Sequence, residues 1–146
     1  MRFLVDSNIL LRFTQTSSSQ NRAVSNAPIK LKSSKETLHI VPKNLIEFWG
    51  VCTRPLTNNG LGLSVPETQT EIIGLKKLFT FLDDTPNIFR RWERLVFVHK
   101  VLGKNVHDAR LVAAMLEHNI THLLTLNVKD FKRFDEITVV DPAEVT

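Results

Sequence analysis

The sequence predicts an α/β fold, with one parallel sheet of about five strands and helices on both of its faces. Short apolar runs alternate along the chain with longer segments of helical periodicity. The first run, residues 2–5, is followed at once by Asp6 and a second apolar stretch, which leaves no room for a long loop. Such alternation is typical of parallel sheets, in which functional groups gather at the carboxyl ends of the strands.

Length, charge and cysteine content bound the kind of protein. The 146 residues suit one domain with a substantial core, expected to span residues 1–146. Lys and Arg number 19 against 15 Asp and Glu, and the net charge of +4 permits a polyanionic partner. Cys52 is the only cysteine, which excludes an internal disulfide and favours a reducing compartment. Without an apolar run of about 18 residues, we expect a cytoplasmic protein that does not enter membranes.

The first strand and the first two helices are predicted before residue 37. Residues 2–5 are apolar and form the strand, and residues 9–13 begin a helix directly after it. The polar run 14–20 is predicted to be a mobile loop. A weaker helix is predicted over residues 23–32, with Pro28 in its first turn, where proline is tolerated.

A second strand and two further helices are predicted over residues 38–77. Pro42 stops the strand at residues 38–41 and opens a helix over residues 42–51. The Gly/Asn loop at 58–64 lacks the spacing of a nucleotide-binding fingerprint, and a helix follows it to about residue 77. The apolar stripe of the first of these helices consists of Leu45, Phe48, Trp49 and Cys52.

The second half of the chain supplies three more strands. They are predicted at residues 78–82, 121–126 and 137–140, each an apolar run bounded by polar residues. A helix over residues 87–102 is expected to end at Gly103, which suits the left-handed conformation after a helix.

Isolated carboxylates stand at several of these element ends, and each has an ordinary structural explanation. Asp6 is the only acid among the first thirty-five residues, yet Asp is also a good N-cap. Glu47 lies in a very apolar helix, where an outward-facing glutamate is the usual outcome. Asp108, in the stretch 106–115, stands where an N-cap belongs, ahead of an Ala-rich helix. The adjacent His107 has three interpretations, a ligand, a substrate contact or a core histidine, of which we favour the last.

The coincidence of these acids favours a site over separate structural roles. In a parallel sheet Asp6, Glu47, Asp108 and Asn127 fall at or near one edge, with Asp130 close by. Carboxylates brought together without a fixed cation repel one another strongly, so at neutral pH they are protonated or bind a metal. Hard oxygen ligands suit Mg²⁺ or Mn²⁺ and argue against zinc.

Four motifs follow one another along the chain. They are Leu-Val-Asp-Ser-Asn at residues 4–8, Pro-Lys-Asn-Leu-Ile-Glu-Phe-Trp at 42–49, His-Asp-Ala-Arg-Leu-Val-Ala at 107–113 and Leu-Thr-Leu-Asn-Val-Lys-Asp-Phe at 124–131. In their order and spacing they resemble the PIN domain, most closely that of VapC-type toxins of bacterial toxin–antitoxin pairs, and the resemblance extends over nearly the whole chain. The resemblance implies a Mg²⁺- or Mn²⁺-dependent endoribonuclease that acts on RNA, has a cognate antitoxin and forms a homodimer.

The resemblance also implies roles for individual residues. Asp6, Glu47 and Asp108 match the three acidic, metal-binding positions of the family. Asn127 matches a fourth catalytic position that is often Asp, so one negative charge is missing. Whether the site binds one metal ion or two is left open. The residues that match or adjoin supporting positions are Ser7, Asn8 and Asp130, the last a rival for the fourth position.

Two other functions remain open at this stage. One is a PIN-like module that binds RNA without cleaving it, because its fourth position is weakened. The other is a phosphatase of the haloacid dehalogenase type, which also places an aspartate after its first strand. That enzyme requires a second aspartate two residues later, where this chain has Asn8.

Overall fold

The computed structural model describes residues 1–15 and 22–145. The predicted loop at residues 14–20 therefore lies largely outside the described residues. The strands are β1 (Arg2–Val5), β2 (Thr37–Ile40), β3 (Thr80–Phe81), β4 (His122–Leu124) and β5 (Thr138–Val140). The helices are α1 (Ser7–Thr14), α2 (Arg22–Ser33), α3 (Pro42–Thr53), α4 (Val65–Leu78), α5 (Pro86–Val98), α6 (Asn105–Glu117) and α7 (Val128–Phe131), with short 3₁₀ turns η2 (Leu56–Asn58) and η3 (Pro142–Glu144).

The strands form one five-stranded sheet in the order β3-β2-β1-β4-β5, and every neighbouring pair is parallel. The predicted parallel α/β sheet is therefore confirmed. β1 lies at the centre, and the chain adds β2 and β3 on one side of it and β4 and β5 on the other. The carboxyl end of β1 is consequently the point at which the strand order reverses, which is where ligands bind in open α/β sheets.

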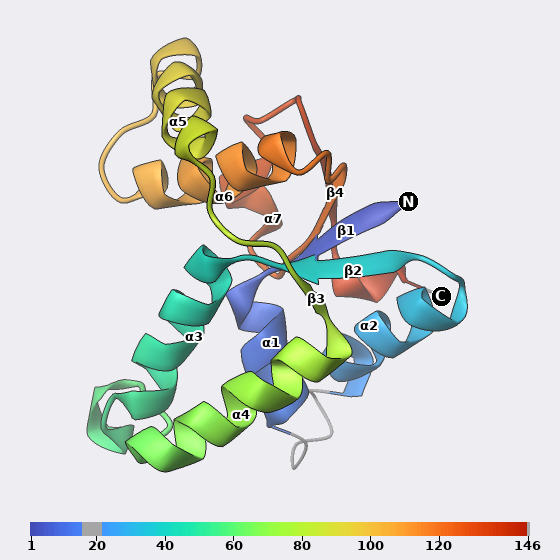
Figure 1. The fold of residues 1–146 in the computed structure, drawn as a ribbon, viewed down its shortest axis with the longest axis vertical. Coiled ribbons are helices and arrows are strands. Elements are labelled where there is room, and N and C mark those ends of the chain that lie inside the picture. Colours follow the sequence, from blue (N-terminus) through green and yellow to red (C-terminus); the bar gives the residue numbers. More distant parts are fainter. Residues whose placement is uncertain (16–21, 146) are drawn as a thin grey trace.

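Helices cover both faces of the sheet, as Figure 1 shows, with α1 to α4 on one side and α5, α6 and α7 on the other. Side chains of β1 alternate between the two cores: Leu4 faces α6, whereas Phe3 and Val5 face α1 and α3. Leu4 and Val5 are fully buried, so β1 is rigidly held on both faces. Among the described residues, no helix is both long and apolar enough to cross a membrane.

Two predictions about these helices are wrong, the place of Pro28 and the end of α5. Pro28 lies inside α2, which runs from Arg22 to Ser33, and not in its first turn. Buried Ala27 and Leu31 pack α2 against the core, and this packing outweighs the hydrogen bond that a proline removes. Gly103 does not end α5, which stops at Val98.

Candidate metal and active site

The four residues predicted for the site lie together. Asp6, Glu47, Asp108 and Asn127 line one cavity of about 200 Å³. Asp6 joins β1 to α1, Glu47 lies on α3, Asp108 lies in α6, and Asn127 immediately precedes α7. The cavity thus gathers side chains from four distant segments at the carboxyl edge of the central strands. The roles predicted for these residues remain predictions.

Asp6 is held more firmly than the other acids. Its Oδ1 accepts a hydrogen bond from Ser7 N at 2.7 Å, and its Oδ2 accepts one from Thr125 Oγ1 at 2.7 Å. Burial raises the pKa of Asp6 above its usual range, against the lowering effect of the bonds from Thr125 and Ser7. Asp6 is also the N-cap of α1, so the capping and cavity interpretations both hold.

Asn8 fastens the end of β1 to the segment that follows β4. Its Nδ2 lies 3.4 Å from Asp6 Oδ2 and 3.4 Å from Thr125 Oγ1, and its Oδ1 accepts from Leu126 N at 3.3 Å. Asn8 therefore orients the groups around Asp6 instead of supplying a second carboxylate. This arrangement argues against the phosphatase alternative, whose chemistry needs an acid at that position.

Glu47 combines an exposed side chain with two protein contacts inside the site. Ser7 Oγ donates to its Oε2 at 2.8 Å, and Lys43 Nζ contacts its Oε1. The side chain of Glu47 is 42% exposed, yet it lines the cavity, so the outward-facing alternative does not describe it fully. Ser7 links Glu47 to Asp6, because its main-chain N–H binds one acid and its hydroxyl the other.

Asp108 is the acid whose charge is least compensated. Burial raises its pKa to about 6, and the negative charges of Asp130, Asp6 and Glu47 add to that effect in this order. None of the described residues donates a hydrogen bond to the Asp108 carboxylate. The predicted N-cap role is wrong: Lys104 caps α6, which begins one turn earlier than expected, and Asp108 lies within the first turn.

Asn127 and Asp130 occupy different parts of the edge. The side chain of Asn127 makes no capping bond to α7 and lines the cavity, while its main-chain N donates to Thr125 Oγ1 at 3.0 Å. Asp130 is exposed and lines an adjoining depression instead. Its charge nevertheless affects Asp108 more than that of Asp6 does, so Asp130 remains a rival for the fourth position.

Three residues at the site were assigned another role from the sequence or were not predicted to belong to it. His107 is exposed and lines the cavity, so it is not a core histidine. Lys43 provides a fixed cation beside Glu47, contrary to the assumption that the acids meet without one; its i,i+4 spacing from Glu47 was a visible signal. Thr125 carried no signal, because its role follows from the pairing of β4 with β1.

The donor set of the cavity fits Mg²⁺ or Mn²⁺. Asp6, Glu47 and Asp108 offer carboxylate oxygens and Asn127 offers an amide oxygen, all of them hard ligands. The raised pKa values of Asp6 and Asp108 indicate negative charge that the protein itself compensates only in part. A divalent cation held by these residues would relieve that repulsion.

A different group of possible ligands lies elsewhere. In residues 1–15 and 22–145, the only three metal-ligand side chains whose atoms approach within 4.8 Å of one another are His99, Asp135 and Glu136. His99 Nε2 lies 2.9 Å from Glu136 Oε2. Asp135 and Glu136 precede β5, at the amino edge of the sheet, so this group is separate from the cavity after β1. We interpret it as an ion pair that holds the end of α5.

No family model matches the chain, and no curated protein sequence does. Solved structures do. A chain of VapBC-1 from nontypeable Haemophilus influenzae matches with a TM-score of 0.73 and 16% identity, covering 99% of this chain and 100% of that one. A chain of DNA-bound VapBC2 from Rickettsia felis gives 0.72 and 16%, covering 97% and 98%. The Sarcin-Ricin loop cleaving toxin VapC20 from Mycobacterium tuberculosis gives 0.57 and 17%, covering 83% and 86%.

These similarities establish the fold. The identities are low, but the coverage extends over nearly the full length of both chains in the two best of these matches. The chain therefore has the PIN-domain fold of VapC-type toxins, as the four sequence motifs predicted.

Proposed function

We propose that the chain is a metal-dependent endoribonuclease that hydrolyses phosphodiester bonds in RNA, and that it is the toxin of a toxin–antitoxin pair. One observation carries the proposal: Asp6, Glu47 and Asp108 line a single cavity at the point where the strand order of the sheet reverses. The fold shared with a toxin described as cleaving the Sarcin-Ricin loop supports RNA as the substrate.

The residues of the cavity have distinct parts in this proposal. A divalent ion, when bound, would supply Lewis-acid chemistry at the phosphate and activate a water. Asp6, Glu47 and Asp108 would hold it, with the amide oxygen of Asn127 as a neutral donor. Ser7 and Thr125 keep Asp6 oriented through hydrogen bonds of 2.7 Å each, so the acid is preorganised. His107, exposed at the rim, is placed to contact the substrate.

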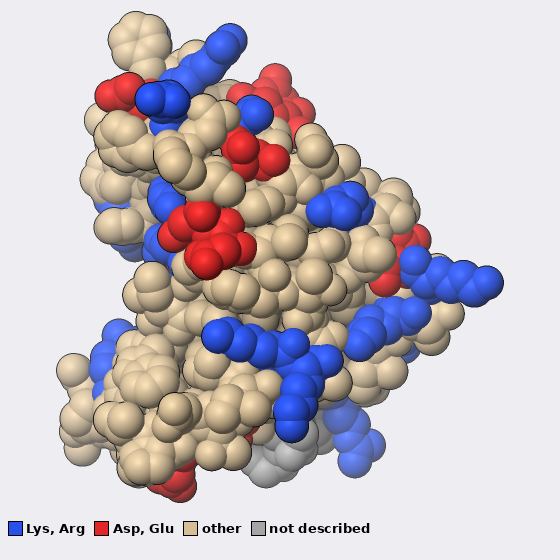
Figure 2. Space-filling view, in the orientation of Figure 1, with Lys and Arg blue, Asp and Glu red and all other residues tan. Residues whose placement is uncertain are grey.

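The charge distribution outside the cavity suits a polyanion. Figure 2 shows Lys and Arg side chains spread over the half of the molecule built from α2 and α4, where few carboxylates lie in this view. Basic side chains at the surface attract phosphate groups over distances of about 10 Å at moderate salt. Basic side chains on α2 and α4, which do not line the cavity, would attract the RNA backbone and leave the acids free for a metal.

Cleavage of a mixture of purified ribosomal and transfer RNA tests the proposal. We expect cleavage with Mg²⁺ or Mn²⁺, its loss on addition of EDTA, and its return when excess Mn²⁺ is restored. Binding of RNA without cleavage at any metal concentration would favour the non-catalytic RNA-binding alternative. Cleavage that persists undiminished in EDTA would contradict metal dependence.

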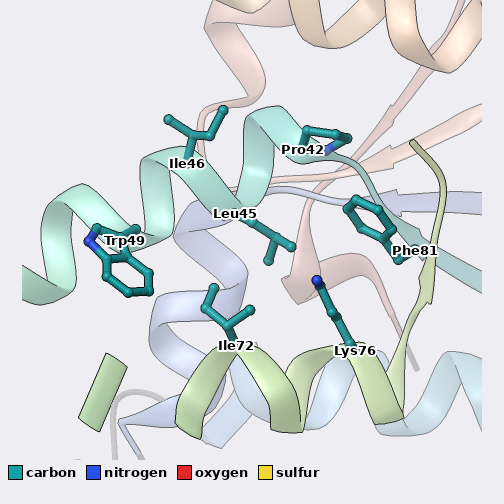
Figure 3. Close-up of a pocket in the computed structure, with 7 residues that line it drawn as sticks. All are labelled: Pro42, Leu45, Ile46, Trp49, Ile72, Lys76 and Phe81. Atoms are coloured by element: carbon teal, nitrogen blue, oxygen red, sulfur yellow. The ribbon is translucent and has the colours of Figure 1, made fainter. Parts of the chain in front are cut away.

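An apolar groove supports the proposed antitoxin as a protein partner. Figure 3 shows it between α3, α4 and β3. Its volume is about 440 Å³. Ile46 is 68% exposed in its wall, immediately before Glu47 in the sequence. α3 thus separates the groove from the acid cavity, to which it contributes Glu47 and Val51. The lining residues are Pro42, Leu45, Ile46, Trp49, Ile72, Lys76 and Phe81.

Ile46→Glu is expected to weaken capture of the antitoxin at least tenfold, because it places a charge in an apolar contact. The probe is the purified cognate antitoxin, and its binding is measured by calorimetry. Ile29→Glu, at an equally apolar exposed position on α2, is the control and should change nothing. Equal binding by both variants would remove the groove from the interface.

The other properties implied by the resemblance belong to the same proposal. A homodimer remains a prediction that the mass in solution, measured by light scattering, decides. A cytoplasmic location is supported by the single cysteine, Cys52, which is free and buried.

A further inference from the structure

Lys43 is a partly buried cation that contacts Glu47 at the edge of the carboxylate cavity without lining the cavity itself. Its side chain is only 19% exposed, whereas that of its partner Glu47 is 42% exposed. Both lie on α3, one turn apart, and the helix start is fixed by Asn44, whose Oδ1 accepts from Val41 N at 2.9 Å. A lysine is rarely this well covered unless an acid compensates its charge. The Lys43 ammonium therefore lies against the protein beside Glu47 and does not extend into solvent.

The ammonium acts on the cavity as a whole. Lys43 Nζ contacts Glu47 Oε1 while Ser7 Oγ donates to Glu47 Oε2, so both oxygens of this acid are engaged by the protein. The positive charge of Lys43 also reaches Asp108, whose pKa it lowers against the stronger effects of burial and neighbouring acids.

Charge balance then limits how many metal ions the cavity holds. Asp6, Glu47 and Asp108 contribute three negative charges, and Lys43 removes one, which leaves enough to compensate one divalent ion. Asp130, whose charge also reaches Asp108, lines the adjoining depression and not this cavity, so it is not counted among the ligands. Two divalent ions about 3.5–4 Å apart need several bridging carboxylates to offset their repulsion. Asn127 adds no charge, so the deficit is not made up at the fourth position.

We propose that Lys43 is a resident cation of the carboxylate cavity, which takes the place of a second divalent ion and restricts the site to one. This inference rests on the proposed function in one respect, namely that the cavity holds a metal. Lys43 acts as a positioning residue, because it works through Glu47 and through the field at Asp108. With RNA bound, the same ammonium neutralises part of the phosphate charge that a second metal ion would otherwise offset.

Titration of Mn²⁺ into the RNA-free protein at neutral pH, followed by calorimetry, tests the inference. The wild type is expected to bind one Mn²⁺. Lys43→Gln removes the competing cation and frees a Glu47 oxygen, so it should bind the first ion about tenfold more tightly or acquire a second site. Lys43→Arg keeps the charge and should behave as the wild type. Lys77→Gln, an exposed lysine at the end of α4, is the matched control for loss of one charge.

The partner residue supplies a second arm. In a Glu47→Gln background, Lys43→Gln should lose most of its effect on Mn²⁺ affinity, because the two residues are coupled. Asn127→Asp adds a carboxylate without touching the ammonium and should tighten binding in either background. Circular dichroism of every variant excludes unfolding as the cause.

Several results would overturn the inference. They are two tight sites in the wild type, no Mn²⁺ binding at all, and a Lys43→Gln isotherm identical to that of the wild type. Failure of the proposed function looks different, since the titration contains no RNA. A protein that binds Mn²⁺ as described but never cleaves RNA contradicts the ribonuclease and leaves the role of Lys43 standing.

Discussion

Asp108→Asn is expected to lower the rate of RNA cleavage by about a thousandfold, the scale seen when one group that stabilises the charge of the transition state is removed. The fold should survive. No described residue donates a hydrogen bond to the Asp108 carboxylate, whose pKa is raised to about 6 by burial and by Asp130, Asp6 and Glu47. The amide therefore removes repulsion and loses no structural contact. Initial cleavage rates at saturating Mn²⁺ and the midpoint of thermal unfolding measure the two effects.

Asp6→Asn should lower the rate of cleavage by a similar factor, and it should also lower the free energy of unfolding. Asp6 accepts hydrogen bonds from Ser7 N and Thr125 Oγ1. In the asparagine variant the amide nitrogen faces one of these donors, and that donor loses its acceptor. Asp135→Asn, at the opposite edge of the sheet, is the control that should cleave normally. Full activity in Asp108→Asn would show that Asp108 contributes to α6 and not to the chemistry.

The sheet was predictable from the sequence because its signals are local. Apolar runs such as residues 2–5, short connections, and prolines at helix starts each restrict the backbone without reference to distant parts of the chain. The errors arose where tertiary packing decides. Pro28 is tolerated inside α2 because Ala27 and Leu31 are buried, and nothing local in the sequence reports that burial.

The acids of the site were found by their isolation, but their environment was not. Asp and Asn serve equally as N-caps and as metal ligands, so Asp108 was assigned one turn out of place in α6. Thr125 lies 119 residues from Asp6, and only the register of β4 on β1 brings its hydroxyl to that carboxylate. Lys43 was visible as a helical neighbour of Glu47, yet its burial depends on the surrounding fold.

Metal-free protein should lose stability as the pH rises through the range in which Asp108 ionises. Its pKa is 3.8 in the unfolded reference and about 6 in the fold, so the folded chain binds more protons between these values. The contribution of such a carboxyl group to the free energy of unfolding is therefore fully present below the pKa of the unfolded chain. It is lost as the pH rises through the pKa of the folded chain. Asp6, whose pKa is also raised by burial, adds in the same direction.

The difference between two proteins isolates this effect from other titrating groups. The asparagine that replaces Asp108 in the variant cannot ionise. In EDTA, the thermal unfolding midpoint of Asp108→Asn minus that of the wild type should therefore grow as the pH is raised from about 4 to about 7. A constant difference, or one that shrinks, would show that the Asp108 carboxylate is compensated in the folded protein.

Mn²⁺ should restore the stability that the wild type loses as the pH rises, and it should stabilise Asp108→Asn much less. An ion that binds only the folded chain adds stability by mass action, and at about a hundred times its dissociation constant the unfolding midpoint of a chain this size rises by roughly 5–10 °C. The gain should be largest near neutral pH, where Asp108 is ionised, and should fade below pH 6 as protons compete for the same carboxylate. Because Asp108→Asn keeps Asp6 and Glu47 but lacks that ligand, most of the shift should disappear at every pH. An equal Mn²⁺ shift in both proteins would place the ion outside the cavity, and the group formed by His99, Asp135 and Glu136 would then be the site to examine by the same substitutions.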